Sequence, residues 1–357
     1  MNIVVLCKMT KLLFSLFLIL IVGIPAAYAH PFLLDSEPGQ AQSAPIGTTQ
    51  IITFYSEAIE IDFSELKVFD SNGNKIDNMD TAYYEGKSSL VITTPPLEDG
   101  VYTVTSKVLS KIDGHLVQAA VIFGVGDARV DLSLLEAQEE SETTFLPEAA
   151  ARFPGIIGQT IVLGSVISAI VIWGTQRKHF GKESRDLVNQ AYRLKFVKLT
   201  GIGLVAVLAS NFIMLAVQTL RLETSPVDVI GTAFGTTWLI RMIITIILLG
   251  IWFWMERKPH LSPKKHIPML AASLVLIFTT TMMGHGAATE LTAPIILDYV
   301  HNLLASVWIG GVIFFGFVLL PTLASLDGIQ KAKVTLAILP RYSGMITIAL
   351  GILIITG

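Results

Sequence analysis

The feature that most constrains this chain is a series of long apolar segments in its C-terminal half. These six runs cover roughly 155–174, 197–218, 235–255, 267–284, 299–320 and 344–357. The first five are long enough to cross a bilayer as helices, whereas the sixth stops after 14 residues. We therefore predict an all-α polytopic membrane domain over 154–357 with about six transmembrane helices. We also expect the natural protein to continue beyond the sixth run.

Basic residues are distributed unevenly between the segments that join these runs. The segments 174–197, 255–267 and 321–341 together hold 13 lysines and arginines, whereas 219–234 and 285–298 hold only Arg221. Because basic loops stay on the cytoplasmic side, this pattern predicts a multi-pass cell-membrane protein with an extracytoplasmic N-terminal domain. The formal net charge of −3 gives no support to nucleic-acid binding.

The first 29 residues have the layout of a secretory signal peptide. Two lysines precede a short apolar run over 12–24, and the small-x-small pattern Ala27-Tyr28-Ala29 follows. The run is too short for a membrane anchor, so we expect cleavage after Ala29. Cleavage would remove Cys7, the one cysteine of the chain, and would make His30 the first residue of the mature protein.

The segment 30–126 is predicted to form an all-β domain. Short β-branched runs near 49–54, 66–69, 90–92, 101–104 and 117–125 are separated by turn residues. This spacing is typical of an antiparallel sandwich or barrel. The stretch 127–153 is acidic and weakly apolar, and we interpret it as a linker to the membrane domain.

Three residues of the β-domain form a candidate Cu(II) site. An N-terminal His30 would offer its amine and its ring nitrogen as a chelate, and nitrogen and oxygen donors suit Cu(II). Asp113 and His115, separated by Gly114, point to the same face if the segment is extended. Asp113-Gly114 alone predicts only a hairpin turn, and His30 alone a surface histidine. Their conjunction favours a metal site, because the domain contains no other histidine.

Several motifs of the N-terminal half resemble the CopC family of extracytoplasmic copper-binding domains. They are His30-Pro31-Phe32-Leu33-Leu34, Ser36-Glu37-Pro38-Gly39, Phe54-Tyr55-Ser56-Glu57, Leu97 through Tyr102 and Asp113-Gly114-His115. The resemblance implies an Ig-like Greek-key barrel that binds Cu(II) through His30, Asp113 and His115. Some members add a methionine-rich Cu(I) site, which we do not expect here because Met79 is the only methionine of the domain.

The membrane half resembles the CopD-type copper-transport proteins, so that the whole chain resembles a CopC–CopD fusion. The motifs that carry this resemblance are Phe234 through Arg241, Gly284-His285-Gly286-Ala287, His301 through Gly311 and Arg341-Tyr342-Ser343. The membrane domain of that family usually has more helices than the six runs found here. This difference again suggests that a C-terminal part follows.

A second candidate metal site lies at the outer ends of two helices. Met282, Met283 and His285 end one apolar run, and Asp298 and His301 begin the next, on the side of the β-domain. Thioethers suit Cu(I), although each methionine taken singly is explained as well by packing. A charged Arg241 inside an apolar run is interpreted as a structural charge, facing the cytoplasm or the bundle interior. His179, His260 and His266 receive no role.

These observations together predict a copper-handling membrane protein rather than an enzyme. Its outer domain would bind Cu(II) and pass copper to the membrane domain for uptake, homeostasis or resistance. A reductase would be needed if copper crosses as Cu(I), and other copper chaperones are possible partners. No P-loop supports ATP-driven pumping by this chain.

Three alternatives remain open at this point. Two histidines at equal depth on neighbouring helices could hold a b-type haem for electron transfer. An N-terminal histidine chelate could activate oxygen in a copper-dependent oxygenase, although Asp113 as a ligand would close that site. A purely structural anchor would leave His30 unexplained. The direction of copper transport is not encoded in any of these spacings.

Overall fold

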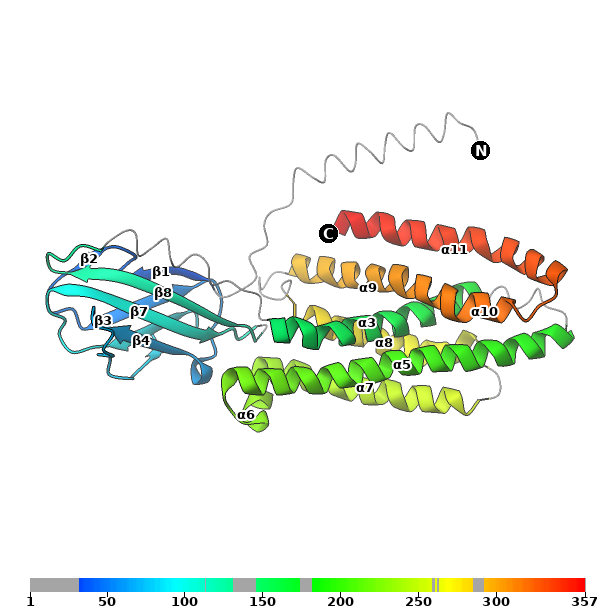
Figure 1. Cartoon of the computed structure of the whole chain (residues 1–357), viewed down its shortest axis with the longest axis horizontal. Helices are drawn as coiled ribbons and strands as arrows, with labels where there is room; N and C mark the ends of the chain where they lie inside the picture. Colours follow the sequence, from blue (N-terminus) through cyan, green and yellow to red (C-terminus); the bar gives the residue numbers. More distant parts are fainter. Residues whose placement is uncertain are drawn as a thin grey trace, which may run out of the picture.

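A β-domain lies at one end of a long bundle of helices in the computed structural model (Figure 1). The structure describes residues 32–112, 114–130, 146–173, 182–258, 261, 263–284 and 292–356. The expected signal peptide lies outside these residues, as do the predicted site residues His30, Asp113 and His285.

The β-domain consists of two four-stranded sheets that share one apolar core. The first sheet has the order β1-β3-β6-β5, and its strands are β1 (Leu33–Glu37), β3 (Gln50–Tyr55), β6 (Ser89–Thr93) and β5 (Ala82–Tyr83). The second sheet has the order β2-β8-β7-β4, and its strands are β2 (Ser43–Ala44), β8 (Leu116–Val125), β7 (Gly100–Leu109) and β4 (Glu65–Phe69). Neighbouring strands are antiparallel except for the pair β2 and β8.

Alternation of buried and exposed side chains explains why these segments form strands. In β4, Leu66 and Val68 are buried while the residues between and beside them are partly exposed. These two side chains belong to the same apolar core as Leu90 and Ile92 of the opposite sheet. The sandwich and all five predicted strand segments are therefore confirmed, and β7 is longer than its sequence pattern indicated.

The C-terminal half is entirely helical within the residues described. Its elements, with short 3-10 or π segments labelled η, are α3 (Leu146–Ser168), η2 (Ala169–Trp173), α5 (Lys182–Leu222), α6 (Pro226–Gly231), α7 (Ala233–Glu256), η4 (Pro263–His266), α8 (Ile267–Thr281), α9 (Thr292–Phe314), η6 (Phe315–Leu319), α10 (Leu320–Leu323) and α11 (Gly328–Thr356). Helix α3 begins inside the segment 127–153 that the sequence suggested as a linker.

Among the residues described, five helices are long and apolar enough to cross a membrane. They cover 146–171, 189–222, 233–256, 293–323 and 331–356. The sixth apolar run differs from expectation, because it belongs to a helix of 29 residues that starts at Gly328. The apolar residues before Arg341 continue the same helix, so only 324–327 separate it from α10. Helix α8, with 15 residues, is instead the short one.

Helix α3 packs chiefly against α5 and α9, and glycines make both contacts close. A Cβ atom at Gly158 would meet the backbone of Gly203 in α5, and one at Gly164 would meet the backbone of Gly310 in α9. Small residues at such positions let membrane helices approach each other closely. The glycines therefore fix α3 between its two neighbours.

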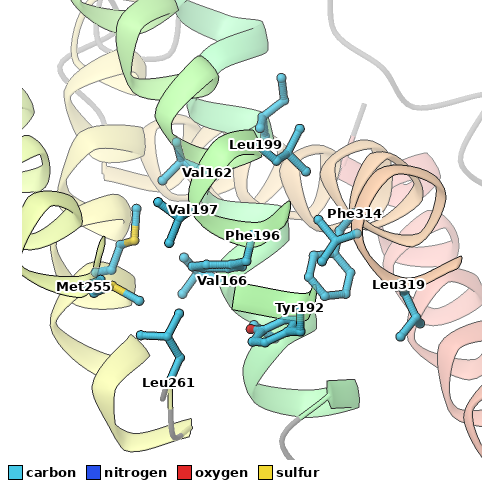
Figure 2. Packing of buried hydrophobic residues seen from close by; sticks show 14 of the residues in the cluster. Val162, Val166, Tyr192, Phe196, Val197, Leu199, Met255, Leu261, Phe314 and Leu319 are labelled. Carbon is cyan, nitrogen blue, oxygen red and sulfur yellow. The ribbon is translucent and has the colours of Figure 1, made fainter. Parts of the chain in front are cut away.

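The end of the bundle away from the β-domain is packed with aromatic side chains. Figure 2 shows Tyr192 and Phe196 of α5 beside Phe314 of α9. The ring centroids of Tyr192 and Phe196 are 5.6 Å apart. The Tyr192 hydroxyl lies 3.0 Å from Nε2 of His266, and both residues are buried. His266, for which the sequence suggested no role, is thus a packed structural histidine.

Candidate functional site at the domain junction

Two segments that carry predicted ligands lie side by side at one end of the β-domain. The backbone of Phe32, two residues after His30, exchanges hydrogen bonds with Ser56, whose N–H donates to the Phe32 carbonyl at 3.0 Å. On the other side of this segment, the Lys111 N–H donates to the Ala58 carbonyl at 2.9 Å. The chain after His30 and the loop with Asp113 therefore flank the same short segment.

Of the three predicted Cu(II) ligands, only His115 lies within the described residues. It belongs to the loop between β7 and β8, which is closed by a hydrogen bond of 2.8 Å from the Ser110 N–H to the His115 carbonyl. Gly114 precedes it with a φ of +72°, a left-handed conformation that suits glycine. The connection between β7 and β8 spans 110–115, and the expected Asp-Gly turn cannot be compared with it because Asp113 lies outside the described residues.

His115 contacts the membrane domain through an acidic residue. Its Nε2 atom lies 3.2 Å from Oε1 of Glu148, in the first turn of α3. The same carboxylate accepts from Arg152 at 2.7 Å and from Arg221, at the end of α5, at 2.6 Å. We refer to His115, Glu148, Arg152 and Arg221 as the junction cluster. The side chains of His115 and Glu148 are 15% and 13% exposed, so the pair is largely shielded from solvent.

Backbone contacts hold the His115 loop against the bundle on both sides of the histidine. The Gln218 side chain donates to the Gly114 carbonyl at 2.7 Å, and Arg221 donates to the Leu116 carbonyl at 2.6 Å. A Cβ at Gly114 would lie 2.7 Å from Cβ of Phe234, so glycine is also required by close approach. The loop is therefore fixed to α5 and α7 rather than exposed to solvent.

An apolar seam lies beside the junction cluster. It joins Leu109 of the β-domain to buried side chains of α3, α5, α6, α7 and the end of α8. Its bundle members are Ala151, Met214, Leu222, Val229, Phe234, Trp238 and Met283. Burial of this seam provides the apolar part of the contact between the two domains.

The predicted membrane residues are distributed over this end of the bundle. Met283 is 4% exposed within the apolar seam, and its carbonyl accepts from Arg152 at 2.8 Å. Met282 is the C-cap of α8 and is partly buried. Asp298 in α9 accepts a hydrogen bond of 3.0 Å from Asn302. His301 lies toward α11, with Nδ1 3.2 Å from the Thr356 hydroxyl. Met283 and His301 therefore contact different neighbours.

A second polar cluster, missed in detail by sequence reasoning, surrounds Arg241 inside the bundle. The Arg241 side chain is 3% exposed and donates to oxygens of Asn211, Gln159 and Thr280 at 2.9, 3.2 and 2.7 Å. Further bonds reach the Leu276 carbonyl and the Thr279 hydroxyl. We call this the Arg241 cluster. The expectation of a charge in the bundle interior is confirmed, but its partners, which come from α3, α5 and α8, had no sequence signal.

Glu57 is a further carboxylate that the sequence analysis left without a role. It is 7% exposed and follows Ser56, which pairs with Phe32. A buried carboxylate near the segment after His30 is an additional oxygen donor for a cation. Within the described residues, no group of three or more histidine, cysteine, aspartate or glutamate side chains could hold a metal ion. This search does not include His30, Asp113 or His285.

Comparison with known proteins identifies both halves of the chain. Residues 33–126 match the CopC domain family, and residues 143–294 match the copper resistance protein D-like N-terminal domain family. The chain therefore carries a CopC domain and a copper resistance protein D-like N-terminal domain in one polypeptide.

Among individual proteins, the chain is homologous to the copper transport protein CutJ of Bacillus subtilis (strain 168). The two are 24% identical over 317 residues, which cover 83% of this chain and 55% of CutJ. The chain thus spans about half the length of this curated relative.

Solved structures similar to the β-domain include CopC from Methylosinus trichosporium OB3b and PcoC, a methionine-rich copper resistance protein from Escherichia coli. The first is 24% identical, with a TM-score of 0.25, and covers 29% of this chain and all of the CopC chain. The second is 25% identical, with a TM-score of 0.25, and covers 28% of this chain and all of PcoC.

Proposed function

We propose that this protein binds Cu(II) in its β-domain and delivers copper to its membrane domain. The supporting observation is the position of His115, a predicted ligand that lies at the contact between the domains, 3.2 Å from Glu148 of α3. A metal held at this loop would already be next to the membrane domain. The family matches of both halves to copper proteins support the same conclusion.

The proposed capture site comprises the amine and ring of His30, the Asp113 carboxylate and the His115 ring. Phe32 and Lys111 flank the segment 56–58, which supports a short separation between the two ends of this ligand set. These nitrogen and oxygen donors match the preference of Cu(II) for tetragonal coordination. The buried Glu57 beside Phe32 is a further oxygen donor at the same end of the domain.

In this proposal the β-domain is extracytoplasmic and the basic segments face the cytoplasm. The helix ends that flank 174–181, 257–262 and 324–327 lie at the end of the bundle away from the β-domain (Figure 1). This arrangement agrees with the positive-inside rule. Copper would then enter the membrane domain at the end where Met283, Asp298 and His301 lie, after reduction if Cu(I) is the species carried.

The capture site is tested by mass spectrometry of the mature chain combined with Cu(II) titration of the full protein. We expect an N-terminus at His30 and loss of high-affinity binding in His30→Ala and in His115→Ala. His179→Ala, in a basic segment, is the matched control and should bind as the wild type does. A chain that begins elsewhere, or tight binding that survives His30→Ala, contradicts the proposed site.

The membrane route is tested separately by cellular copper content. We expect His285→Ala and His301→Ala to change copper accumulation, while Cu(II) binding by the β-domain is retained. Wild-type accumulation in both variants would remove these histidines from the route without affecting the capture site.

A further inference from the structure

We propose that Glu148 of the membrane domain is a positioning residue for the copper ligand His115, so that copper binding and domain docking strengthen each other. This inference rests on the proposed function, because it takes His115 as a copper ligand. It adds a residue that lies outside the β-domain and outside the predicted ligand set. The argument depends on the two ring nitrogens of His115 and on what surrounds Glu148.

The orientation of the His115 ring separates the roles of its two nitrogens. Nε2 lies 3.2 Å from Oε1 of Glu148, within the range of an N–H···O hydrogen bond. A neutral imidazole that donates from Nε2 carries its lone pair on Nδ1. Nδ1 is the other ring nitrogen and is not the one that contacts Glu148. The geometry therefore points to Nδ1 as the nitrogen that binds copper.

A carboxylate that accepts from the second nitrogen is a common partner of a metal-binding histidine. Such a carboxylate fixes the tautomer and the ring orientation, and it makes the ligating nitrogen more basic. Glu148 has the chemistry and the distance for this role. It differs from an ordinary partner because it belongs to a different domain from the ligand that it orients.

Glu148 is itself fixed by two cations, which suits it to a positioning role. Arg152 donates to Oε1 at 2.7 Å, and Arg221 donates to Oε2 at 2.6 Å. These charge-assisted bonds occupy both carboxylate oxygens and leave Oε1 directed at His115. The arginines also place positive charge near the loop, so Glu148 is better suited to orient His115 than to bind a cupric ion directly.

Two further contacts hold the docked loop in place around His115. Gln218 and Arg221 hold the backbone carbonyls of Gly114 and Leu116, on either side of the histidine. The docked state therefore presents a pre-oriented ligand. By linkage, any increase in copper affinity that docking provides must be matched by an equal increase in docking strength when copper binds.

The inference is tested on the full chain in detergent by Cu(II) titration against a competing chelator. We compare the wild type with Glu148→Gln, which keeps the size of the side chain but removes its charge. Loss of such a partner typically weakens metal binding about 10–100-fold, and we expect that range here. Glu148→Asp, which keeps the charge but withdraws the carboxylate, should give a smaller loss.

Gln218→Met is the matched docking control, because it removes the bond to the Gly114 carbonyl without touching Glu148. It should weaken binding by less than about tenfold. Pulsed electron paramagnetic resonance supplies a second measurement, which would not change if Glu148 only stabilised the docked structure. The quadrupole coupling of the remote imidazole nitrogen should change in Glu148→Gln and stay unchanged in Gln218→Met.

The possible outcomes separate this inference from the proposed function. If the wild type binds no Cu(II), or if His115→Ala binds as well as the wild type, both are wrong. If the wild type binds but Glu148→Gln has the same affinity and coupling, only the role of Glu148 is wrong. Tighter binding by Glu148→Gln would also overturn it, because Glu148 would then compete with copper for Nε2.

Discussion

The junction cluster and the Arg241 cluster both use sheltered arginines, but they balance the charge in different ways. At the junction, Arg152 and Arg221 share one carboxylate, Glu148. In the bundle, neutral oxygens of Gln159, Asn211 and three residues of α8 surround Arg241. An ion pair at a boundary can be exchanged for water when the boundary opens, whereas a cation deep in the bundle cannot.

This difference indicates different tasks for the two clusters. The Arg241 cluster connects α3, α5, α7 and α8 and therefore belongs to the permanent core of the bundle. The junction cluster connects the β-domain to α3 and α5. The packing of the bundle core does not depend on this connection. We expect damage to the first cluster to unfold the bundle, and damage to the second to undock the β-domain.

The largest effect is expected from Arg241→Leu. This change removes the Arg241 donor from the buried side chains of Asn211, Gln159 and Thr279, and each buried acceptor that loses such a bond costs about 1–3 kcal/mol. Thermal unfolding of the detergent-solubilised protein should show the loss. Arg193→Gln, at a partly buried position near the other end of α5, removes one bond to the Glu256 carbonyl; it is the control and should change little. An equal loss in both variants would contradict the structural role of Arg241.

A smaller and more local effect is expected from Glu148→Ala. Removal of the carboxylate leaves Arg152, Arg221 and His115 without their shared partner, at a cost of about 1–3 kcal/mol to docking. Hydrogen exchange should become faster in the loop 110–116, while exchange across α7 stays as in the wild type. If α7 exchanged faster as well, the two clusters would not be independent and the comparison would fail.

Gly114→Ala tests how closely the β-domain approaches the bundle. The alanine would have to adopt the left-handed backbone conformation of Gly114, and its Cβ would collide with Phe234. The backbone conformation alone costs about 1–2 kcal/mol. Gly73→Ala is the matched control, because Gly73 has a φ of +80° but nothing within 4 Å of its would-be Cβ. Equal losses of stability in the two variants would show that the contact with Phe234 has no energetic weight.

The smallest effect is expected from Asp80→Asn, far from both clusters. Hydrogen bonds from Thr93 lower the pKa of Asp80 from its ordinary value. The ionised Asp80 therefore stabilises the fold fully above the pKa that it has in the unfolded chain, near 3.9. This stabilisation is lost as the pH falls through the lower pKa that Asp80 has in the folded protein. Because Asp80 is exposed, we expect no more than about 0.5 kcal/mol. Hydrogen exchange of β6 at pH 3 and pH 6 measures this contribution, and the difference between wild type and variant should be smaller at pH 3 than at pH 6.

Local patterns predicted much of the fold. Alternation in β4 and the turn residues around the other strands were sufficient to locate the sandwich, and long apolar runs located the helices. The helix boundaries at the C-terminal end were less predictable, because the charged Arg341 lies inside α11 and interrupts its apolar pattern. The partners of Arg241 were not predictable either, since they depend on which faces of four helices meet.

The candidate site was predictable only where a motif carried it. Asp113-Gly114-His115 directed attention to the loop that the structure places at the junction. Glu148, by contrast, follows an acidic stretch with several similar residues, and only the packing of α3 against the loop distinguishes it. Glu57 was visible in a strand motif, but its burial became known only from the fold.

Helix α3 contains Pro154, between the turn that carries Glu148 and the glycines that fix the helix to α5 and α9. Proline lacks an N–H, so the Ala150 carbonyl receives no helical bond from that position. The first two turns of α3 therefore have one helical bond fewer to the rest of the helix, and the Ser210 hydroxyl of α5 donates to the Ala151 carbonyl at 2.6 Å. The turn that carries Glu148 is thus anchored by its neighbours in the bundle and not only by its own helix.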